Sequence, residues 1–143
     1  MTGMTSLRNA TVRRGAVASG AAALLAACLL PGGAADAATS LNVKLSDFKV
    51  TPSKTSVGHG KVTFRVKNSA SMEHELVVIK TSKKASQLAS GGKASEKGSV
   101  GEVELAGHRS KSLTLNLKKG HYALICNVGG HYMAGMHADL TVR

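Results

Sequence analysis

Three side chains that can bind a soft metal ion lie in one loop near the end of the chain. Cys126, His131 and Met136 provide a thiol, an imidazole and a thioether at Cys-x4-His-x4-Met spacing. One Cys, two His and a weak axial Met form the ligand set of a blue-copper electron-transfer centre. Three of these four ligands can come from this loop, and His74 is the best candidate for the second histidine. The spacing therefore predicts one type 1 copper ion bound by these four residues.

Other chemistries fit these residues less well. Zinc is bound by Cys, His and carboxylates, and methionine is not among its usual ligands. A cysteine nucleophile needs an activated, partly exposed thiolate, whereas the strand pattern described below points Cys126 into the core. The chain contains no Cys-x-x-Cys pair, haem-attachment motif, phosphate-binding Gly-rich loop or catalytic pair of carboxylates. We therefore expect a protein that is not an enzyme.

Each ligand candidate also has a purely structural interpretation. A lone cysteine at a strand end is most often a packing residue, and Met136 could fill a gap in the core. Met133 competes with Met136 as the axial ligand, but it lies only two residues beyond His131 and has little chain with which to turn back. The combination at this spacing favours a metal site with Met136 in the axial position. The remaining histidines are predicted to be surface or turn residues: His59, His108, His121 and His137.

The beginning of the chain has the pattern of a secretory signal. A head with three Arg residues precedes an apolar run over residues 15–30, and a small-x-small cleavage pattern ends at Ala37. Residues 1–37 are therefore predicted to be the signal, and residues 38–143 to be one domain. No second hydrophobic stretch could cross a membrane. We expect export to the periplasm, the extracellular space or the outer face of the cell membrane.

Cys28, inside the predicted signal, has two interpretations. The sequence Leu-Ala-Ala-Cys ending at Cys28 fits a bacterial lipobox, in which this cysteine would carry lipid and begin the mature chain. The apolar run continues for two residues beyond it, which favours removal by cleavage near Ala37 instead. Either way, Cys126 is left as an unpaired thiol in an oxidising compartment, where thiols are usually paired. A metal bond would protect it, which strengthens the copper prediction.

The predicted domain is strongly basic. The chain has 19 Lys and Arg and 8 Asp and Glu, and residues 1–37 take three Arg and one Asp. Residues 38–143 keep 16 basic and 7 acidic residues, a net charge of +9. Such a charge favours acidic partners or anionic surfaces. Nucleic acid is not expected, because the domain has only four aromatic residues for base stacking: Phe48, Phe64, Tyr122 and Tyr132.

From Ser40 onward, apolar and polar residues alternate in short runs, as in half-buried strands. Turn residues separate the runs, and one helical turn is predicted over residues 86–90 in the loosest stretch. About seven to eight strands in one domain predict an all-β fold, an antiparallel Greek-key β-sandwich. The predicted strands contain Leu41–Leu45, Val62–Val66, His74–Ile79, Val103–Leu105, Leu113–Leu117, Tyr122–Cys126 and Ala138–Val142. The strand at His74–Ile79 is expected to be central and buried on both faces.

Alternation also places two ligand candidates. Cys126 shares a predicted face with Tyr122 and Leu124, and His74 begins the inward-facing row of its own strand. Two inward-facing ligands at the ends of two strands can meet at one pole of a sandwich. Glycines in the loop would let it curl so that His131 reaches the same point.

These residues resemble the cupredoxins, the small blue copper proteins. The likeness covers residues 40–143, and the loop spacing is similar to that of the rusticyanin, auracyanin and sulfocyanin-like members. The resemblance implies that His74, Cys126 and His131 are the strong ligands and Met136 the axial one. One position departs from the family, since many members have Asn after the first histidine, where this chain has Glu75. The likeness is strongest in Met72–Val78, Gly120-His121-Tyr122, Gly130-His131 and Gly135-Met136.

The resemblance implies a one-electron carrier between larger redox proteins, with His131 as the electron port. The basic charge predicts partners with acidic docking surfaces, and we expect a monomer that associates with a membrane only if Cys28 carries lipid. Two alternatives stay open: a copper carrier or sequestration protein that uses the same ligands, and a metal-free sandwich that serves as an interaction module. A small apolar docking patch is predicted from Met72, Val128, Met133 and Ala134.

Overall fold

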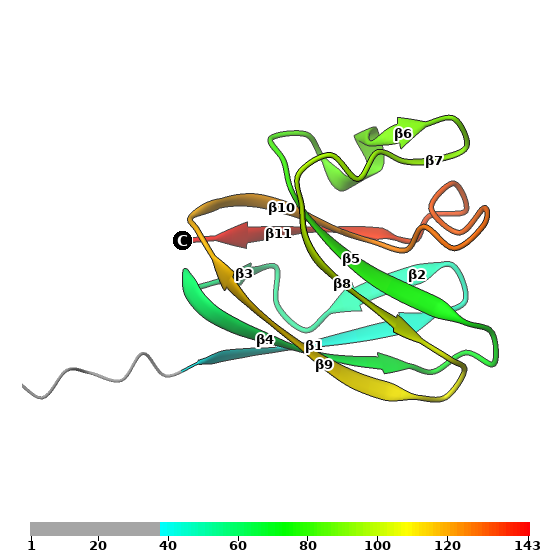
Figure 1. Cartoon of the computed structure of the whole chain (residues 1–143), viewed down its shortest axis with the longest axis horizontal. Coiled ribbons are helices and arrows are strands. Elements are labelled where there is room, and N and C mark those ends of the chain that lie inside the picture. Colours follow the sequence, from blue (N-terminus) through cyan, green and yellow to red (C-terminus); the bar gives the residue numbers. More distant parts are fainter. Residues whose placement is uncertain (1–37) are drawn as a thin grey trace, which may run out of the picture. The chain divides into compact units, whose positions relative to one another are not determined.

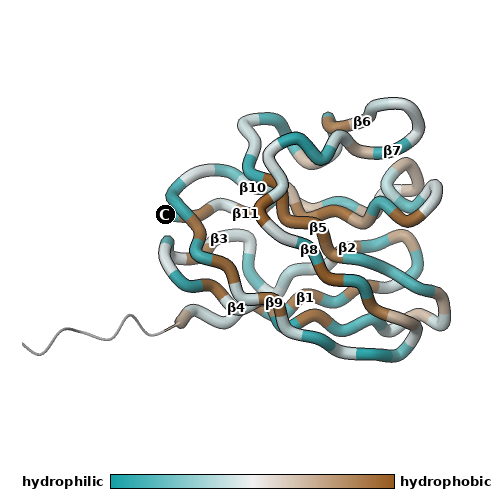
Figure 2. The backbone as a smooth tube through the Cα atoms, in the orientation of Figure 1, coloured by the Kyte–Doolittle hydropathy of each residue, from teal (hydrophilic) through white to brown (hydrophobic). Residues whose placement is uncertain are grey.

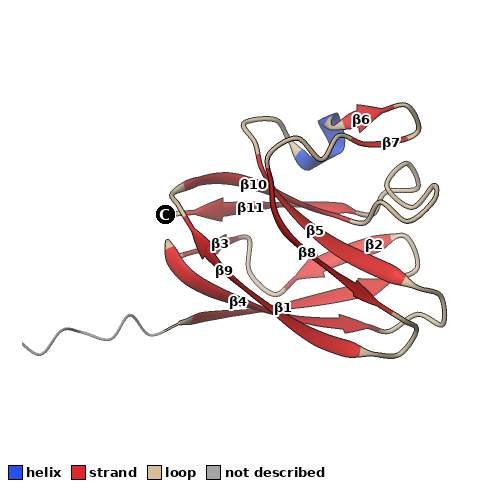
Figure 3. Ribbon diagram, viewed as in Figure 1, coloured by secondary structure: helices blue, strands red, loops and turns tan. Residues whose placement is uncertain are grey.

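The computed structural model describes residues 38–143, which form two packed β-sheets and an outlying hairpin (Figures 1 and 3). The predicted signal over residues 1–37, with Cys28, lies outside the described residues. The helical structure in the described part is a single 3-10 helix of three residues. No helix there is long and apolar enough to span a membrane.

Eleven strands and the short helix follow one another along residues 38–143. The seven long strands are β1 (Thr39–Ser46), β4 (Gly60–Asn68), β5 (His74–Lys80), β8 (Ser99–Leu105), β9 (Ser110–Leu117), β10 (Gly120–Ile125) and β11 (His137–Val142). The short elements are β2 (Lys49–Pro52), β3 (Ser56–Val57), η1 (Ala85–Gln87), β6 (Ala89–Ser90) and β7 (Lys93–Ala94). Each long strand corresponds to one predicted from alternation. The four short strands raise the count above the predicted seven to eight, because two to four residues leave little alternation to detect.

The strands form two sheets and a separate hairpin of β6 and β7. One sheet has the order β2-β1-β4-β9 and the other β3-β11-β10-β5-β8. The predicted β-sandwich is confirmed. Six of the eight strand pairings are antiparallel, and the pairs β1–β4 and β3–β11 are parallel. The β1–β4 pair is parallel because the chain crosses from β1 through β2 and β3 before it returns as β4, and a parallel neighbour needs such a crossover.

The main core lies between the two sheets and takes alternate residues from each strand. In β4, Val62, Phe64 and Val66 are buried, whereas Lys61 and Arg65 are exposed. The same alternation appears as brown and teal stretches along the strands in Figure 2. Burial of one face of each sheet is what stabilises a sandwich.

A second, smaller core covers the other face of β5 and β10. The segment between β5 and β8, which carries η1, β6 and β7, lies over these strands (Figure 1). The prediction that β5 is buried on both faces is thereby confirmed. The helical turn predicted over residues 86–90 is found only in part: η1 begins one residue earlier and ends at Gln87, and residues 89 and 90 form strand β6. The cluster consists of Val77, Ile79, Ala85, Leu88, Ala94, Ala123, Ile125 and Tyr132.

Gly107 makes a close backbone contact just before the predicted ligand strand. A Cβ atom at this position would overlap the backbone carbonyl of Ser71, three residues before His74. We expect Gly107→Ala to lower the free energy of unfolding by about 1–3 kcal/mol, because overpacking forces a backbone shift. Urea unfolding measures this. Gly58→Ala is the control, since a Cβ there meets nothing within 4 Å, and equal costs for the two variants would contradict the contact.

Candidate metal centre

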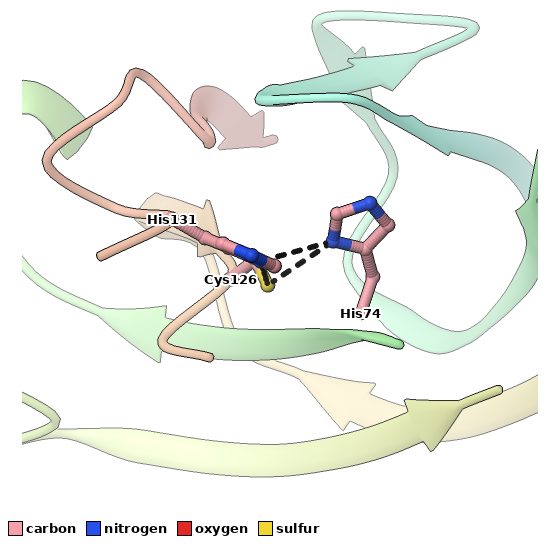
Figure 4. A group of neighbouring side chains, drawn as sticks. All are labelled: His74, Cys126 and His131. Carbon is pink, nitrogen blue, oxygen red and sulfur yellow. Dashed lines mark hydrogen bonds between the residues drawn. The ribbon is translucent and has the colours of Figure 1, made fainter. Parts of the chain in front are cut away.

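Three of the predicted ligands meet at one end of the sandwich (Figure 4). His74 is the first residue of β5, Cys126 follows the last residue of β10, and His131 lies in the loop between β10 and β11. β5 and β10 are antiparallel neighbours, with Val77 opposite Ile125. The end of β10 therefore lies beside the start of β5, which brings Cys126 to His74.

The donor atoms of the three side chains face one another. The Nδ1 atoms of His74 and His131 are 3.1 Å apart. The Cys126 sulfur lies 3.8 Å from Nδ1 of His74 and 3.5 Å from Nδ1 of His131. His74 and Cys126 are fully buried, and His131 is 9% exposed. Residues 38–143 contain no second group of three Cys, His, Asp or Glu side chains with such geometry.

Burial at the site favours the uncharged forms of His74 and Cys126. Burial lowers the pKa of His74, and the neighbouring His131 lowers it further. Burial raises the pKa of the Cys126 thiol, although backbone N–H groups of Glu75 and Val128 oppose that shift. A soft cation that binds thiolate and neutral imidazole would replace the thiol proton here.

The loop from Cys126 to Met136 is closed by its own backbone. The N–H of Cys126 donates to the carbonyl of Met136 at 3.0 Å, and the N–H of Met136 donates to the carbonyl of His131 at 3.1 Å. Met136 is fully buried in the same apolar cluster as Cys126. Met133, the competing candidate for the axial position, is 59% exposed. The loop geometry therefore favours Met136.

Glu75 joins the start of β5 to the ligand loop. Its carboxylate oxygen Oε1 accepts a 2.8 Å hydrogen bond from the backbone N–H of Asn127, and its own N–H points at the Cys126 sulfur at 3.4 Å. Burial raises the pKa of this carboxyl, and the bond from Asn127 opposes the rise. The residue that departs from the family pattern thus makes a direct connection between the two ligand-bearing segments.

We expect Glu75→Ala to lower the free energy of unfolding by about 1–3 kcal/mol, because it leaves the Asn127 N–H without its partner. Glu75→Gln should cost less, since the side-chain amide keeps an acceptor oxygen. Urea unfolding of the copper-free protein measures both, and amide hydrogen exchange reports on Asn127 directly. The control is Glu73→Ala, which removes an exposed carboxylate two residues away. If Glu73→Ala lowers the free energy of unfolding as much as Glu75→Ala does, the loss of charge explains the effect and the hydrogen bond does not.

Two further residues of the loop anchor it to the segment between β5 and β8. The Tyr132 hydroxyl donates to the carbonyl of Ala85 at 2.7 Å and accepts from the N–H of Leu88 at 2.8 Å. The Asn127 side chain accepts from the N–H of Ala94 at 2.8 Å and donates to its carbonyl at 3.0 Å. Nothing in the residue types or their spacing signals these contacts. They hold the loop from the side opposite the main core.

Phe48 covers the outer side of His131. It lies in the turn between β1 and β2, is 46% exposed, and has a φ of 56°, which is unusual for an aromatic residue. Its ring meets the ring of His131 edge to face, with centroids 5.7 Å apart. An exposed aromatic residue in a turn between two strands was the available sequence signal for this neighbour.

The four histidines predicted to be surface or turn residues lie outside the cluster. His59 Nδ1 is 2.8 Å from the carbonyl of Arg143 at the far end of the fold. His121 lies between the carbonyl of Thr81 and the carboxylate of Asp139, at 2.9 Å from each. His108 is exposed in a turn with a φ of 59°, and the His137 ring lies beside Tyr132.

A β-sandwich with one Cys and two His converging at a pole defines a blue copper protein, or cupredoxin. The sequence supports this class independently, since residues 37–143 match the family described as copper binding proteins, plastocyanin/azurin family. The chain belongs to this family. The resemblance to cupredoxins and the prediction of one type 1 copper ion are thereby confirmed. Comparison with curated protein sequences finds no match.

Solved structures of blue copper proteins share the fold. Dithionite-reduced auracyanin from Roseiflexus castenholzii superposes with a TM-score of 0.59 at 19% identity, over 74% of this chain and 98% of that one. Auracyanin A from Chloroflexus aurantiacus, described as a "blue" copper protein, gives 0.55 at 22% identity, over 73% and 99%. Rusticyanin from Thiobacillus ferrooxidans gives 0.58 at 14% identity, over 73% and 78%. At these identities the likeness concerns the fold.

The residues at the pole fit copper on their own chemistry. One sulfur and two imidazole nitrogens, with no carboxylate among them, suit copper better than hard cations. Nε2 of His74 is buried and has no hydrogen-bond partner. A neutral ring with its proton on Nε2 leaves Nδ1, the atom that faces Cys126 and His131, free to bind an ion.

Proposed function

We propose that this chain is an exported one-electron carrier that holds its copper ion with His74, Cys126, His131 and Met136. The observation that carries the proposal is the convergence of one buried sulfur and two ring nitrogens, all within 4.8 Å of one another. Bound copper supplies electron exchange between its cuprous and cupric states, because thiolate and thioether suit Cu(I) and imidazole suits both states.

The protein's own contribution is to hold these groups still and dry. His74 is held by the pairing of β5 with β8, and Cys126 and His131 are held by the backbone bonds that close the loop. The connection from Glu75 to Asn127 ties the two segments together. A site that cannot rearrange favours fast electron exchange, and the N–H group of Glu75 beside the sulfur would tune the potential.

We propose that redox partners dock over His131. The exposed apolar side chains Phe48, Met72 and Met133 come from the two turns next to the pole and from the ligand loop itself. Asp47 and Glu73 lie in the same turns. The net positive charge of the domain would steer acidic partners from a distance. Close to His131, where these two acidic residues lie, the contact would be mainly apolar. Export rests on the secretory pattern of residues 1–37.

The test is a visible absorption spectrum and a voltammogram of the protein after addition of Cu(II). An intense thiolate-to-copper band with a reversible potential would support the electron carrier. The same band without reversible exchange, together with ready transfer of Cu(I) to an apo-acceptor, would favour the copper carrier. Burial of the donors argues against ready transfer. A colourless protein that does not retain copper would contradict both.

A further inference from the structure

The outer face of the β2-β1-β4-β9 sheet carries only positive charge. Its four strands contain six basic residues and no Asp or Glu. All seven acidic residues of residues 38–143 lie in the turns, in the segment between β5 and β8, or in the other sheet. The net charge of the domain is therefore concentrated on one side of the sandwich. Five of them lie on the outward-facing row, namely Lys44, Lys49, Lys61, Arg65 and Lys67, whereas Lys111 is paired with the buried Val66 at the exposed start of β9.

The strand register places several of these charges side by side. Lys44 of β1 is directly opposite Lys67 of β4, and Arg65 is opposite Asn42 on one side and Ser112 on the other. Lys44, Arg65, Lys67, Lys111, Ser110 and Ser112 line a groove of about 600 Å³ on this face.

Nothing in the described part of the chain neutralises this cluster. The one ion pair in residues 38–143 joins His121 to Asp139, on β10 and β11 of the other sheet. Like charges on adjacent positions of neighbouring strands repel each other. The arrangement therefore costs stability in the isolated domain, and an external polyanion would relieve that cost.

The character of the face indicates which polyanion fits. The exposed large apolar residues are Phe48, Met72, Val100 and Met133, and none lies on these four strands. A protein partner would normally find aromatic or aliphatic anchors at the centre of its interface. A single-stranded nucleic acid would need exposed aromatic rings on which its bases could stack. Neither is present on this face, where Ser, Thr and Asn separate the basic residues. Such a surface is complementary to a plane of anionic lipid headgroups, which attracts basic residues through its charge alone.

We propose that this face binds the anionic surface of a phospholipid bilayer whether or not Cys28 carries lipid, which differs from the expectation drawn from the sequence. The predicted copper ligands come from β5 and from the loop between β10 and β11, so none lies on the strands of this face. The ligand loop and the start of β1 are at opposite ends of the sandwich (Figure 1). The protein would therefore lie on its basic sheet and leave the end that carries His131 open to partners. This inference does not depend on the copper site.

The test is co-sedimentation of the domain Ala38–Arg143 with lipid vesicles. Both sheets and both apolar clusters lie within these residues, so we expect the domain to fold on its own. Vesicles of phosphatidylcholine are compared with vesicles in which about a third of the lipid is phosphatidylglycerol. We expect binding to the anionic vesicles only, and its loss as salt rises, because salt screens exposed charges.

Matched variants locate the binding surface. The triple variant Lys44→Gln, Arg65→Gln, Lys67→Gln should bind anionic vesicles about a hundredfold more weakly, since each basic residue near such a surface contributes roughly fivefold in affinity. The control variant Lys83→Gln, Lys93→Gln, Lys97→Gln removes the same charge from the segment between β5 and β8 and should bind within about threefold of the parent. Adding a charge with Ser112→Lys should strengthen binding.

The proposal is overturned by any of three results. They are no binding to anionic vesicles at low salt, equal binding to both kinds of vesicle, and equal losses in the two triple variants. Thermal unfolding checks that the variants are folded. The face variant relieves repulsion and should be at least as stable as the parent. Loss of vesicle binding in a variant that unfolds at the parental temperature is the supporting result.

Discussion

Replacing Cys126 with serine should abolish the intense visible absorption of the copper-loaded protein. That absorption requires a thiolate bonded to copper, and Cys126 is the one cysteine in residues 38–143. A serine hydroxyl has nearly the same size, but it is a hard donor that stays protonated and does not suit Cu(I). Absorption spectra of parent and variant, loaded with equal copper and compared by mass, measure the effect. An intense band in the variant would refute the assignment of Cys126.

Two methionine variants complete this experiment. Met136→Leu should keep the band, because thiolate and both imidazoles remain, and should shift the reduction potential, which depends on the axial ligand. Met133→Leu should leave band and potential unchanged, since its side chain is 59% exposed. If Met133→Leu alone shifts the potential, the axial ligand has been assigned to the wrong methionine.

Alternation was sufficient to predict the strands and the direction of the ligands. Val62, Phe64 and Val66 are buried as the period of two requires, and Cys126 faces inward with Leu124. The meeting of His74 with Cys126 was also predictable. Both residues stand at strand ends, and the ends of neighbouring strands lie together in a sandwich.

Contacts between distant segments could not be predicted in this way. Glu75 meets Asn127 across 52 positions, and Asn127 meets Ala94 across 33. Neither pair has a periodic signal, because each depends on how a loop folds over a sheet that is already formed. The register of β1 on β4 places Lys44 opposite Lys67. This register depends on how the strands pair and cannot be predicted from composition. Composition predicted a basic domain but not where its charge lies.

The segment between β5 and β8 illustrates the same limit. The sequence of this segment is rich in Lys, Ser and Gly, which indicates a loose loop. Ala85, Leu88 and Ala94 are nevertheless buried against β5 and β10. Tyr132, in the ligand loop, completes that cluster and is 4% exposed. A segment that looks like a surface loop therefore packs directly against the loop that carries His131.

Replacing Tyr132 should for this reason loosen the metal centre from the outside. Tyr132→Phe removes the hydroxyl and leaves the carbonyl of Ala85 and the N–H of Leu88 without their partner, at a cost of about 1–3 kcal/mol in the free energy of unfolding. Tyr132→Ala also removes the ring and should cost about 3–5 kcal/mol. Urea unfolding of the copper-free protein measures both variants, and amide hydrogen exchange should show faster exchange at Leu88.

The control for Tyr132 is its neighbour in the same loop. Met133→Ala changes an exposed side chain and should alter the free energy of unfolding by no more than about 0.5 kcal/mol. If Tyr132→Ala is equally mild, the loop is held by its own backbone bonds and the outer segment is dispensable. If Tyr132→Ala is costly and the copper-loaded variant also loses its ion faster, the segment between β5 and β8 supports the metal centre. Rigidity of the ligand set would then depend on both cores, since Cys126 is held by the main core and the loop beside it by the second.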